Sequence, residues 1–319
     1  MSAAAKDIIS SSWAKSTRAK YNGYIRRWSE YCQRHQIEPY SSTTSKGIDF
    51  LVHLHHEGAK YDTVAGARSA LSAILPVCNG VSFGKNTTVS RILKGMFKIR
   101  PRLPKQIVIY DMNRVLKYMV ELPQNECLSL GTLTGKLATL LCILSGQRAQ
   151  TIVNLHINLM EVADEEVVFF NPVILKTTTP SSHQKPLVFQ SFPHNNKLCV
   201  VGCLGNYIQR VRHIRKHSAG SATNLILSYA SPHNPVKSAT LARYVTDFLG
   251  KCGIDLTVYT AHSTRKASTS KAEKLGLSLK EISGAAGWKS ASTFQKHYKL
   301  PITNNFGSSL LQDFQSTTL

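Results

Sequence analysis

Residues 261–268 read AHSTRKAS, and the rest of the chain is interpreted from this stretch. It places the imidazole of His262 and the guanidinium of Arg265 three positions apart, so a helix would carry both on one face. The chain has no acidic residue between Leu256 and Glu273. An arginine without a carboxylate nearby is typical of an anion site, and phosphate suits the guanidinium fork. The stretch therefore predicts a site for a phosphodiester.

The composition indicates a nucleic-acid partner. The 319 residues have room for two domains, and 39 Lys and Arg against 18 Asp and Glu give a net charge of +21. A field of this sign favours a polyanion such as double-stranded DNA. No apolar run has the length of a transmembrane helix, so we expect no membrane partner, and no feature predicts a small-molecule substrate.

The cysteines and histidines do not form a metal motif. Seven widely spread cysteines indicate reduced thiols and no disulfide framework. Cys199 and Cys203 are four positions apart, but no second Cys or His pair lies at zinc spacing, so buried apolar cysteines are the better interpretation. A solvated or groove-facing helix surface explains His53, His55 and His56 better than a metal does.

The first part of the chain is predicted to be an all-helical, basic bundle. Apolar residues recur at helical spacing in residues 13–35, 46–57, 61–75 and 87–97, and Thr44 or Ser45 is the expected cap of the second helix. The first helix carries aromatic residues on one face and cations on another. A DNA-facing helix and a core helix with a solvated basic back explain this pattern equally well. The candidate DNA-binding residues here and in the following linker are Lys15, Arg18, Lys20, Arg26, Arg27, Arg100 and Arg102.

A proline-rich basic segment separates this bundle from the rest. Residues 99–105 read IRPRLPK, which favours an extended chain near a phosphate backbone. The predicted domains are therefore 1–98 and 107–319, joined by a linker at 99–106. The second domain is predicted to be mainly helical, with short β segments at residues 167–170, 173–175 and 187–189. Its helices are predicted at 111–120, 133–144, 149–155, 197–215, 240–249, 262–275, 278–285 and 291–298.

Six strings in the second domain resemble the tyrosine recombinases, also called the phage integrase family. The likeness is greatest to the recombinases of DIRS-like mobile elements of eukaryotes. The strings appear in the family's order over roughly residues 140–300 and are specific as a set. They are SGQRAQTIVNL, the lysine of LKTTTP, LCVVGCLGNYIQRVR, LSYASPHNPV, AHSTRKASTSKA and GWKSASTFQKHY.

The resemblance implies a fold and a set of catalytic residues. The fold is mainly α-helical with a small antiparallel sheet, and a helical core-binding domain completes a C-shaped clamp on duplex DNA. Tyr298 stands as the nucleophile that forms a 3′-phosphotyrosyl bond, without a cofactor or a metal ion. The other implied catalytic residues are Arg148, Lys176, His262, Arg265 and Trp288. Two roles stay open for His262, namely proton exchange with the tyrosine and a hydrogen bond to the phosphate.

Three positions depart from the family pattern. Trp288 and Tyr298 are ten residues apart, against nine in many bacterial relatives. Thr151 stands where an acidic residue is common, three positions after Arg148, so that arginine would be supported differently. The family's general acid is a lysine that protonates the leaving 5′-oxygen. The motif favours Lys176 for this role, and Lys185 is a second candidate. Taken alone, Arg148 is also explained by an ion pair with Glu161 or Asp164.

The sequence thus predicts site-specific DNA cutting and rejoining, for integration of a mobile element. We expect a homo-tetramer on two DNA sites. The expected location is the nucleus for a eukaryotic element, and otherwise the cytoplasm, in association with DNA. Residues 306–319 are a candidate docking tail. Two alternatives remain, a domesticated DNA-binding protein that no longer cuts and a relaxing enzyme similar to type IB topoisomerases.

Overall fold

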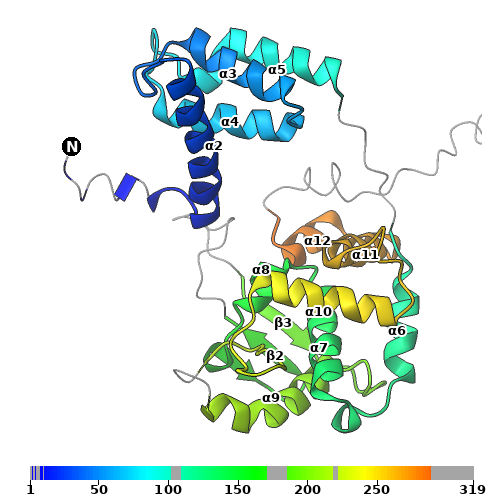
Figure 1. The fold of residues 1–319 in the computed structure, drawn as a ribbon. Helices are drawn as coiled ribbons and strands as arrows, with labels where there is room; N and C mark the ends of the chain where they lie inside the picture. The colour runs from blue at the N-terminus through cyan, green and yellow to red at the C-terminus, as the bar shows by residue number, and fades with distance from the viewer. Residues whose placement is uncertain are drawn as a thin grey trace, which may run out of the picture. The chain divides into compact units, whose positions relative to one another are not determined.

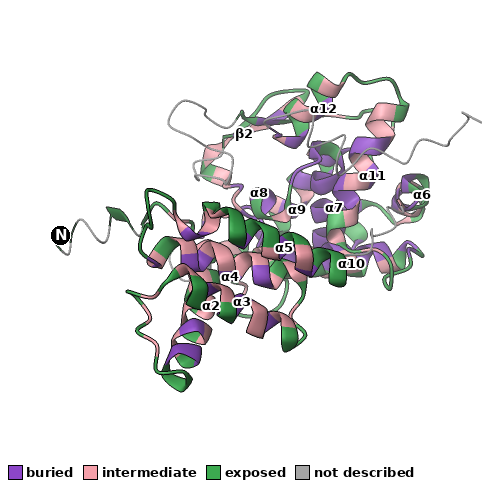
Figure 2. Ribbon diagram, turned by 90° about the horizontal axis from the view of Figure 1, so that it is seen from above, coloured by how far each residue is buried: buried purple, intermediate pink, exposed green. Residues whose placement is uncertain are grey.

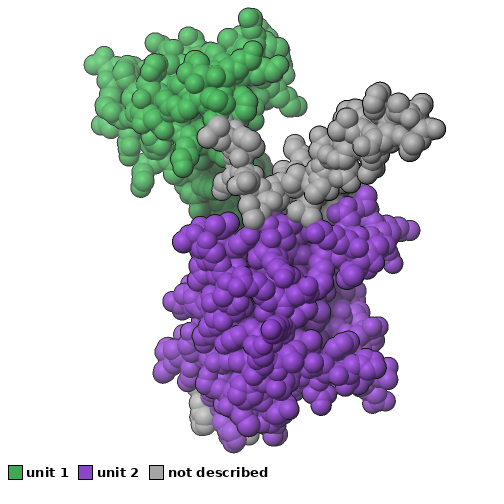
Figure 3. Space-filling view, turned by 90° about the vertical axis from the view of Figure 1, so that its right-hand side faces the viewer, with its two compact units in different colours: residues 1–105 green, residues 106–319 purple. Residues whose placement is uncertain are grey.

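The computed structural model describes residues 11–101, 109–170, 185–217 and 222–288, with Ser2, Ala4, Ile8 and Ile9 before them. The chain divides into two compact units, residues 1–105 and 106–319 (Figures 1 and 3). Each unit has its own hydrophobic core, as expected for two independently packed domains.

Unit 1 consists of helices in its described part, as predicted. These are α2 (Lys15–Arg34), α3 (Thr44–His56), α4 (Tyr61–Ile74) and α5 (Thr87–Ile99), with a single 3₁₀ turn, η1 (Phe83–Lys85), before α5. The four predicted helices are confirmed, with ends that differ by one or two residues. The sequence therefore specifies this bundle through local helix signals and one apolar face on each helix.

The core and caps of unit 1 explain these helix bounds. The fully buried Trp28 of α2 lies with its ring 5.2 Å from Phe50 of α3, and its indole N–H donates to the carbonyl of Pro39 at 2.9 Å. The cap of α3 is Thr43, whose hydroxyl accepts from the Lys46 amide at 3.4 Å. The prediction of Thr44 or Ser45 as the cap was therefore wrong by one or two positions, because five Ser and Thr residues stand in a row at positions 41–45.

Unit 2 is organised around one helix that is buried on almost all sides. This helix, α7 (Leu130–Ser145), packs against helices that surround it, and Figure 2 draws it mostly as buried. A helix that is apolar all round is expected inside a large core. The helices α8 (Ala149–Val153), α9 (Val200–His217), α10 (Ser238–Lys251) and α11 (Ala261–Lys274) pack against it, and α6 (Met112–Glu121) and α12 (Leu279–Ala286) pack against α11.

The described strands of unit 2 form a three-stranded antiparallel sheet in the order β1–β2–β3. The strands are β1 (Met160–Val162), β2 (Glu166–Phe169) and β3 (Leu187–Gln190), and alternate residues of β2 and β3 are buried. This confirms the predicted small antiparallel sheet. The sequence did not predict β1, a three-residue edge strand with a charged centre, and the segment predicted at 173–175 lies outside the described residues.

The thiols agree with the sequence analysis. All seven cysteines are free, and five of them, including Cys199 and Cys203, are buried. Within the described ranges no helix is long and apolar enough to cross a membrane. The same ranges contain no group of three or more Cys, His, Asp or Glu side chains placed to hold a metal ion.

Candidate active site

The stretch 261–268 forms the start of α11, at one end of unit 2 (Figure 1). The amide of Thr260 donates to the Ser263 hydroxyl at 3.1 Å, and the amide of Ala261 donates to the Thr246 hydroxyl of α10 at 3.2 Å. These contacts fix the first turn of the helix. His262 and Arg265 therefore lie one turn apart on a helix whose start is attached to α10.

Arg265 is a buried cation at 2% exposure. Its Nη2 donates to the carbonyl of Ala286 at 2.8 Å, and its guanidinium carbon lies 4.6 Å from the centroid of the Trp288 ring. Burial of a charge costs free energy unless the charge is hydrogen-bonded or lies on an aromatic face. Arg265 has both kinds of contact, so its guanidinium is held in one place before any DNA is present.

The end of α12 is held by side chains from two other segments. Gln147 donates from Nε2 to the carbonyl of Ala285 at 2.6 Å, and Arg265 donates to the next carbonyl, that of Ala286. Gly287 then ends the helix at a φ of +65°, a conformation that favours glycine. The two donors satisfy carbonyls that the helix itself leaves open, and so they fix where the chain leads into Trp288.

Arg148 follows a turn that packs against α11. Gly146 ends α7 at a φ of +59°, and a Cβ there would lie 3.4 Å from the Thr269 side chain. The hydroxyl of Ser268 donates to the carbonyl of Ile143 in the last part of α7. Arg148 itself is exposed at the start of α8, and no ion pair in the described part of the chain joins it to Glu161 or Asp164.

The pKa of His262 is lowered by burial and by the cations near it. The side chain reaches the surface, yet its pKa lies below the ordinary value because the protein around the ring displaces water. The positive charges of Arg265, Lys266 and Arg148 lower the pKa further, in that order. The ring is therefore neutral near pH 7 and can accept a proton or donate one N–H.

The structure thus brings together four of the six predicted catalytic residues. Trp288 contacts Arg265, which lies one turn after His262 on α11, and the charges of Arg265 and Arg148 both act on His262. Lys176 and Tyr298 lie outside the described residues. Lys185 is described, and it is exposed just before β3.

Sequence reasoning missed Gln147. Its side chain is 7% exposed, and its Oε1 accepts from the hydroxyl of Thr151 at 3.3 Å. Its partner Ala285 is 138 positions away, so no local pattern could predict the contact. The available signal was a polar residue between Gly146 and Arg148, directly after an apolar helix.

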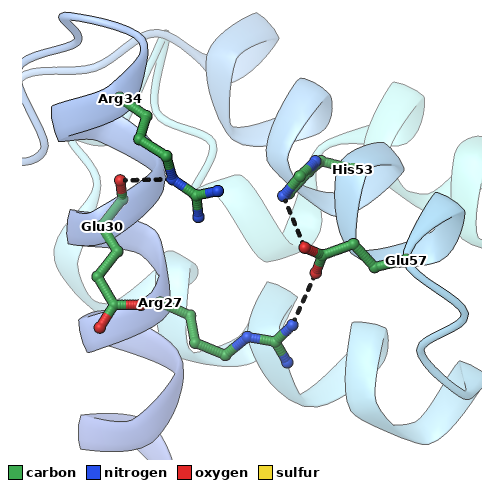
Figure 4. Close-up of polar contacts among 5 residues, drawn as sticks. All are labelled: Arg27, Glu30, Arg34, His53 and Glu57. Carbon is green, nitrogen blue, oxygen red and sulfur yellow. Dashed lines mark hydrogen bonds and ion pairs between the residues drawn. The ribbon is translucent and has the colours of Figure 1, made fainter.

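The candidate DNA-binding cations of unit 1 fall into two groups. Lys15 and Lys20 are exposed, and Arg26, whose side chain is 79% exposed, lies at a long distance of 3.8 Å from the Glu30 carboxylate. By contrast, Arg27 is 2.9 Å from the Glu57 carboxylate, which also lies 3.2 Å from His53 (Figure 4). The charge of Arg27 is therefore partly used inside unit 1.

The remaining three candidates are Arg18, Arg100 and Arg102. Arg100 donates to the carbonyl of His55 at 3.4 Å, which attaches the residue after α5 to the end of α3. Arg18 is half-buried on α2, and Arg102 lies outside the described residues. Exposed cations such as Lys15 and Lys20 can bind a phosphate backbone directly, whereas Arg27 and Arg100 would first have to give up a contact within unit 1.

An open cavity of about 520 Å³ lies at the start of α10. The rings of Tyr229 and Tyr244 lie 4.5 Å apart beside it, and Arg243 lies over Tyr244. None of the four described catalytic candidates lines this cavity, so it is separate from the candidate site.

Solved structures of DNA recombinases share this fold. Lambda integrase, residues 75–356, bound as a dimer to a COC′ core site, matches with a TM-score of 0.53 at 17% identity over 93% of both chains. XerH site-specific recombinase bound to its difH substrate matches at 0.55 and 12% identity, over 88% of this chain and 75% of that chain. The Tn1549 transposon integrase with transposon right end DNA matches at 0.52 and 12% identity, over 85% of both.

These likenesses show the fold, which is that of the catalytic domain of tyrosine recombinases. No curated protein sequence matches the chain. Residues 113–301 match the model of the phage integrase family, and the chain therefore belongs to that family. This membership places it among enzymes that transfer DNA strands.

Proposed function

We propose that the protein is a site-specific DNA recombinase, or integrase, which cuts and rejoins duplex DNA through a 3′-phosphotyrosyl intermediate. One observation carries the proposal: in a phage integrase family member, Arg148, His262, Arg265 and Trp288 meet at one end of unit 2. Buried and exposed cations next to a neutral imidazole suit a phosphodiester that gains charge in the transition state.

In the proposed reaction the Tyr298 oxygen attacks phosphorus, and the bond from phosphorus to the 5′-oxygen breaks. The phenol proton passes to His262, whose lowered pKa leaves the imidazole neutral and able to accept it; a hydrogen bond from the ring to the phosphate is the alternative role. Lys176 protonates the leaving 5′-oxygen. The phosphotyrosyl ester keeps the energy of the phosphodiester, so a 5′-hydroxyl can reverse every step without ATP.

The positive charge that phosphoryl transfer requires comes, in this proposal, from protein side chains. Arg148 and Arg265 face the non-bridging oxygens, and the Trp288 indole N–H supplies a further donor. The reaction then needs neither a bound metal ion nor an organic cofactor. Arg265 is already fixed by its contacts with Ala286 and Trp288, so little reorganisation accompanies the reaction.

Unit 1 is proposed as the core-binding domain of a C-shaped clamp. It carries 17 Lys and Arg against six Asp and Glu, and the exposed cations of α2 suit the DNA backbone. We further propose a tetramer on two DNA sites, since lambda integrase has been solved as a tetramer bound to a Holliday junction. Integration of a mobile element of the DIRS-like group, in a nucleus, is the proposed biological setting.

A nicked suicide substrate tests the proposal. A nick just beyond the cleavage site releases a short fragment, so the covalent complex cannot reverse. Wild-type protein incubated with a nicked library of randomised sequence is expected to form a complex that resists denaturation. Tyr298→Phe should form none while binding DNA normally, and Tyr40→Phe, at an exposed position of unit 1, should behave as wild type.

The outcomes separate the alternatives. A wild type that binds DNA but forms no covalent complex contradicts the proposal and supports the DNA-binding protein that no longer cuts. Relaxation of supercoiled DNA without site preference supports the enzyme similar to type IB topoisomerases.

A further inference from the structure

The buried amide of Gln147 lies between partners on two different segments, the buried Thr151 of α8 and the exposed Ala285 of α12. Nε2 donates to the carbonyl of Ala285 at 2.6 Å, and Oε1 accepts from the hydroxyl of Thr151 at 3.3 Å. Gln147 is 7% exposed and Thr151 is 3% exposed, so the contact between these two side chains is shielded from water, while the contact with Ala285 is partly shielded. The residue therefore joins α8 to the end of α12 within the protein interior.

The partners determine which way the amide faces. The Ala285 carbonyl can only accept a hydrogen bond, so Nε2 must face it, because Oε1 there would place two acceptors in contact. The Thr151 hydroxyl can donate, and it meets the remaining Oε1. A carboxylate at position 151 is an acceptor alone when ionised and could not make this contact. A hydroxyl at position 151 thus holds the amide in the orientation that reaches α12.

The same helix end carries Trp288. Arg265 donates a hydrogen bond to the carbonyl of Ala286, and Gln147 donates one to the preceding carbonyl, that of Ala285. A Cβ on Gly287 would lie 3.1 Å from the Gln147 Nε2, so the amide also fills the space against that backbone. Gln147 and Arg265 together fix the path of the chain into Trp288, whose ring lies over Arg265.

Gln147 also stands directly before Arg148. Its backbone amide donates to the Ser145 hydroxyl at 3.2 Å, so both its backbone and its side chain are fixed. Movement of the residue would therefore displace Arg148 on one side and the Trp288–Arg265 contact on the other.

We propose that Gln147 is a positioning residue, held by Thr151, that sets Arg148 and Trp288 at their places around the phosphodiester. The catalytic part of this proposal rests on the proposed recombinase function. The placement of Trp288 does not depend on it, because it follows from contacts between protein groups alone. Small displacements of such groups are expected to slow the reaction much more than they weaken DNA binding.

The test compares four variants of the full chain. Gln147→Met keeps the side-chain length and removes both hydrogen bonds, and Thr151→Val removes only the hydroxyl. Thr151→Ser keeps a hydroxyl and serves as the rescue. Gln209→Met makes the same chemical change as the first variant at an exposed position of α9, at the other end of unit 2 (Figure 1).

Two measurements are made on each variant. The first is the ¹⁹F NMR spectrum of protein labelled with 5-fluorotryptophan, in which Trp13, Trp28 and Trp288 give separate signals and Trp288→Phe assigns the third. The second is single-turnover cleavage of a nicked substrate at saturating protein, together with the Kd for the same DNA. In Gln147→Met and Thr151→Val the Trp288 signal should shift or broaden while the other two stay.

Cleavage by these two variants should fall by roughly 10-fold or more, with Kd within about twofold of wild type. Thr151→Ser and Gln209→Met should match wild type in both measurements. The inference is overturned if the Trp288 signal stays in place, or if it moves while cleavage does not slow. If Gln147→Met fails to fold, Thr151→Val decides the matter alone, since it changes little volume.

The failure of the proposed function gives a different result. A wild-type chain that cleaves no DNA contradicts that function, whatever the variants do. The ¹⁹F spectra still test the placement in that case: a moved Trp288 signal supports it, and an unmoved signal overturns it.

Discussion

The guanidinium carbon of Arg265 lies 4.6 Å from the centroid of the Trp288 ring. The two residues are 2% and 8% exposed, so the contact is largely shielded from water. A cation on an aromatic face is stabilised by the ring quadrupole, and more so when desolvated. This contact therefore holds a buried cation at the centre of the candidate site.

A double-mutant cycle measures this contact. Arg265→Met, Trp288→Leu and the double variant should give a coupling free energy of about 1–2 kcal/mol, because both groups are buried. Urea denaturation followed by circular dichroism provides the four free energies of unfolding. Additive effects within about 0.3 kcal/mol would show that the two side chains do not stabilise each other.

The conformation of Gly287 predicts a cost for alanine there. Gly287→Ala places a Cβ at a φ of +65° and 3.1 Å from the Gln147 Nε2, so both strain and crowding oppose it. Gly276→Ala is the matched control, since its φ is +88° and no atom lies within 4 Å of the added Cβ. We expect Gly287→Ala to lose about 1 kcal/mol more than Gly276→Ala in thermal denaturation.

The larger loss of stability expected for Gly287→Ala than for Gly276→Ala should depend on Gln147. In a Gln147→Ala background the crowding disappears, and the difference between the two glycine variants should shrink toward zero. A difference that persists there would assign the cost to another neighbour.

The lowered pKa of His262 predicts a dependence of stability on pH. A group whose folded pKa lies below its unfolded value binds fewer protons when folded, so stability rises with pH between the two values. Wild-type stability should therefore fall as the pH drops below about 6.5, the ordinary value for histidine, and level off below the folded pKa. Carboxylates and other histidines also titrate and change the stability with pH, and a comparison with a His262 variant removes their contribution.

His262→Gln lacks this titration. The difference in the free energy of unfolding between variant and wild type should therefore change in favour of the variant as the pH falls. ¹H–¹⁵N NMR titration of the imidazole checks the pKa directly. A His262 pKa at or above the ordinary value would contradict the positive field that we assign to Arg265, Lys266 and Arg148.

The two groups of cations in unit 1 predict different salt dependences. Lys20→Gln should reduce the slope of log K against log salt concentration by roughly 0.9 if Lys20 contacts one phosphate. Arg27→Gln should change the slope less, because Glu57 already lies 2.9 Å from that guanidinium. Fluorescence anisotropy with labelled duplex DNA at several salt concentrations measures these slopes.

Glu57→Gln tests the same ion pair from the side of the carboxylate. It removes the carboxylate that Arg27 and His53 share, and so it should strengthen DNA binding and steepen the salt slope. Equal slopes for Lys20→Gln and Arg27→Gln would contradict the division into two groups.

Features that repeat along the chain were predictable from the sequence. The helix predicted at 133–144 lies within α7, which is buried on almost all sides, as a segment with few polar residues requires. The spacing of His262 and Arg265 predicted one helix face, which α11 provides. Likewise, the alternating burial of Val167, Phe169, Leu187 and Phe189 follows from alternating side chains in a strand.

Contacts between distant segments were not predictable in this way. The bond from Gln147 to Ala285 depends on how α7, α8 and α12 pack, which no local pattern encodes. Thr151 was recognised as a departure from the family, but its contact with Gln147 is visible only in the fold. The sequence also did not determine whether the Arg148 side chain is buried or exposed, because a glycine turn after a buried helix can direct the chain into the protein or to its surface.

The most direct test of the central claim is the chemical identity of the DNA–protein bond. The covalent complex from the nicked substrate is digested with nuclease and protease, and mass spectrometry locates the remaining nucleotide. Our account predicts one modified residue, Tyr298, joined to a 3′-phosphate, with a 5′-hydroxyl on the released strand. A nucleotide on any other residue, or a 5′-phosphate on the released strand, would contradict it.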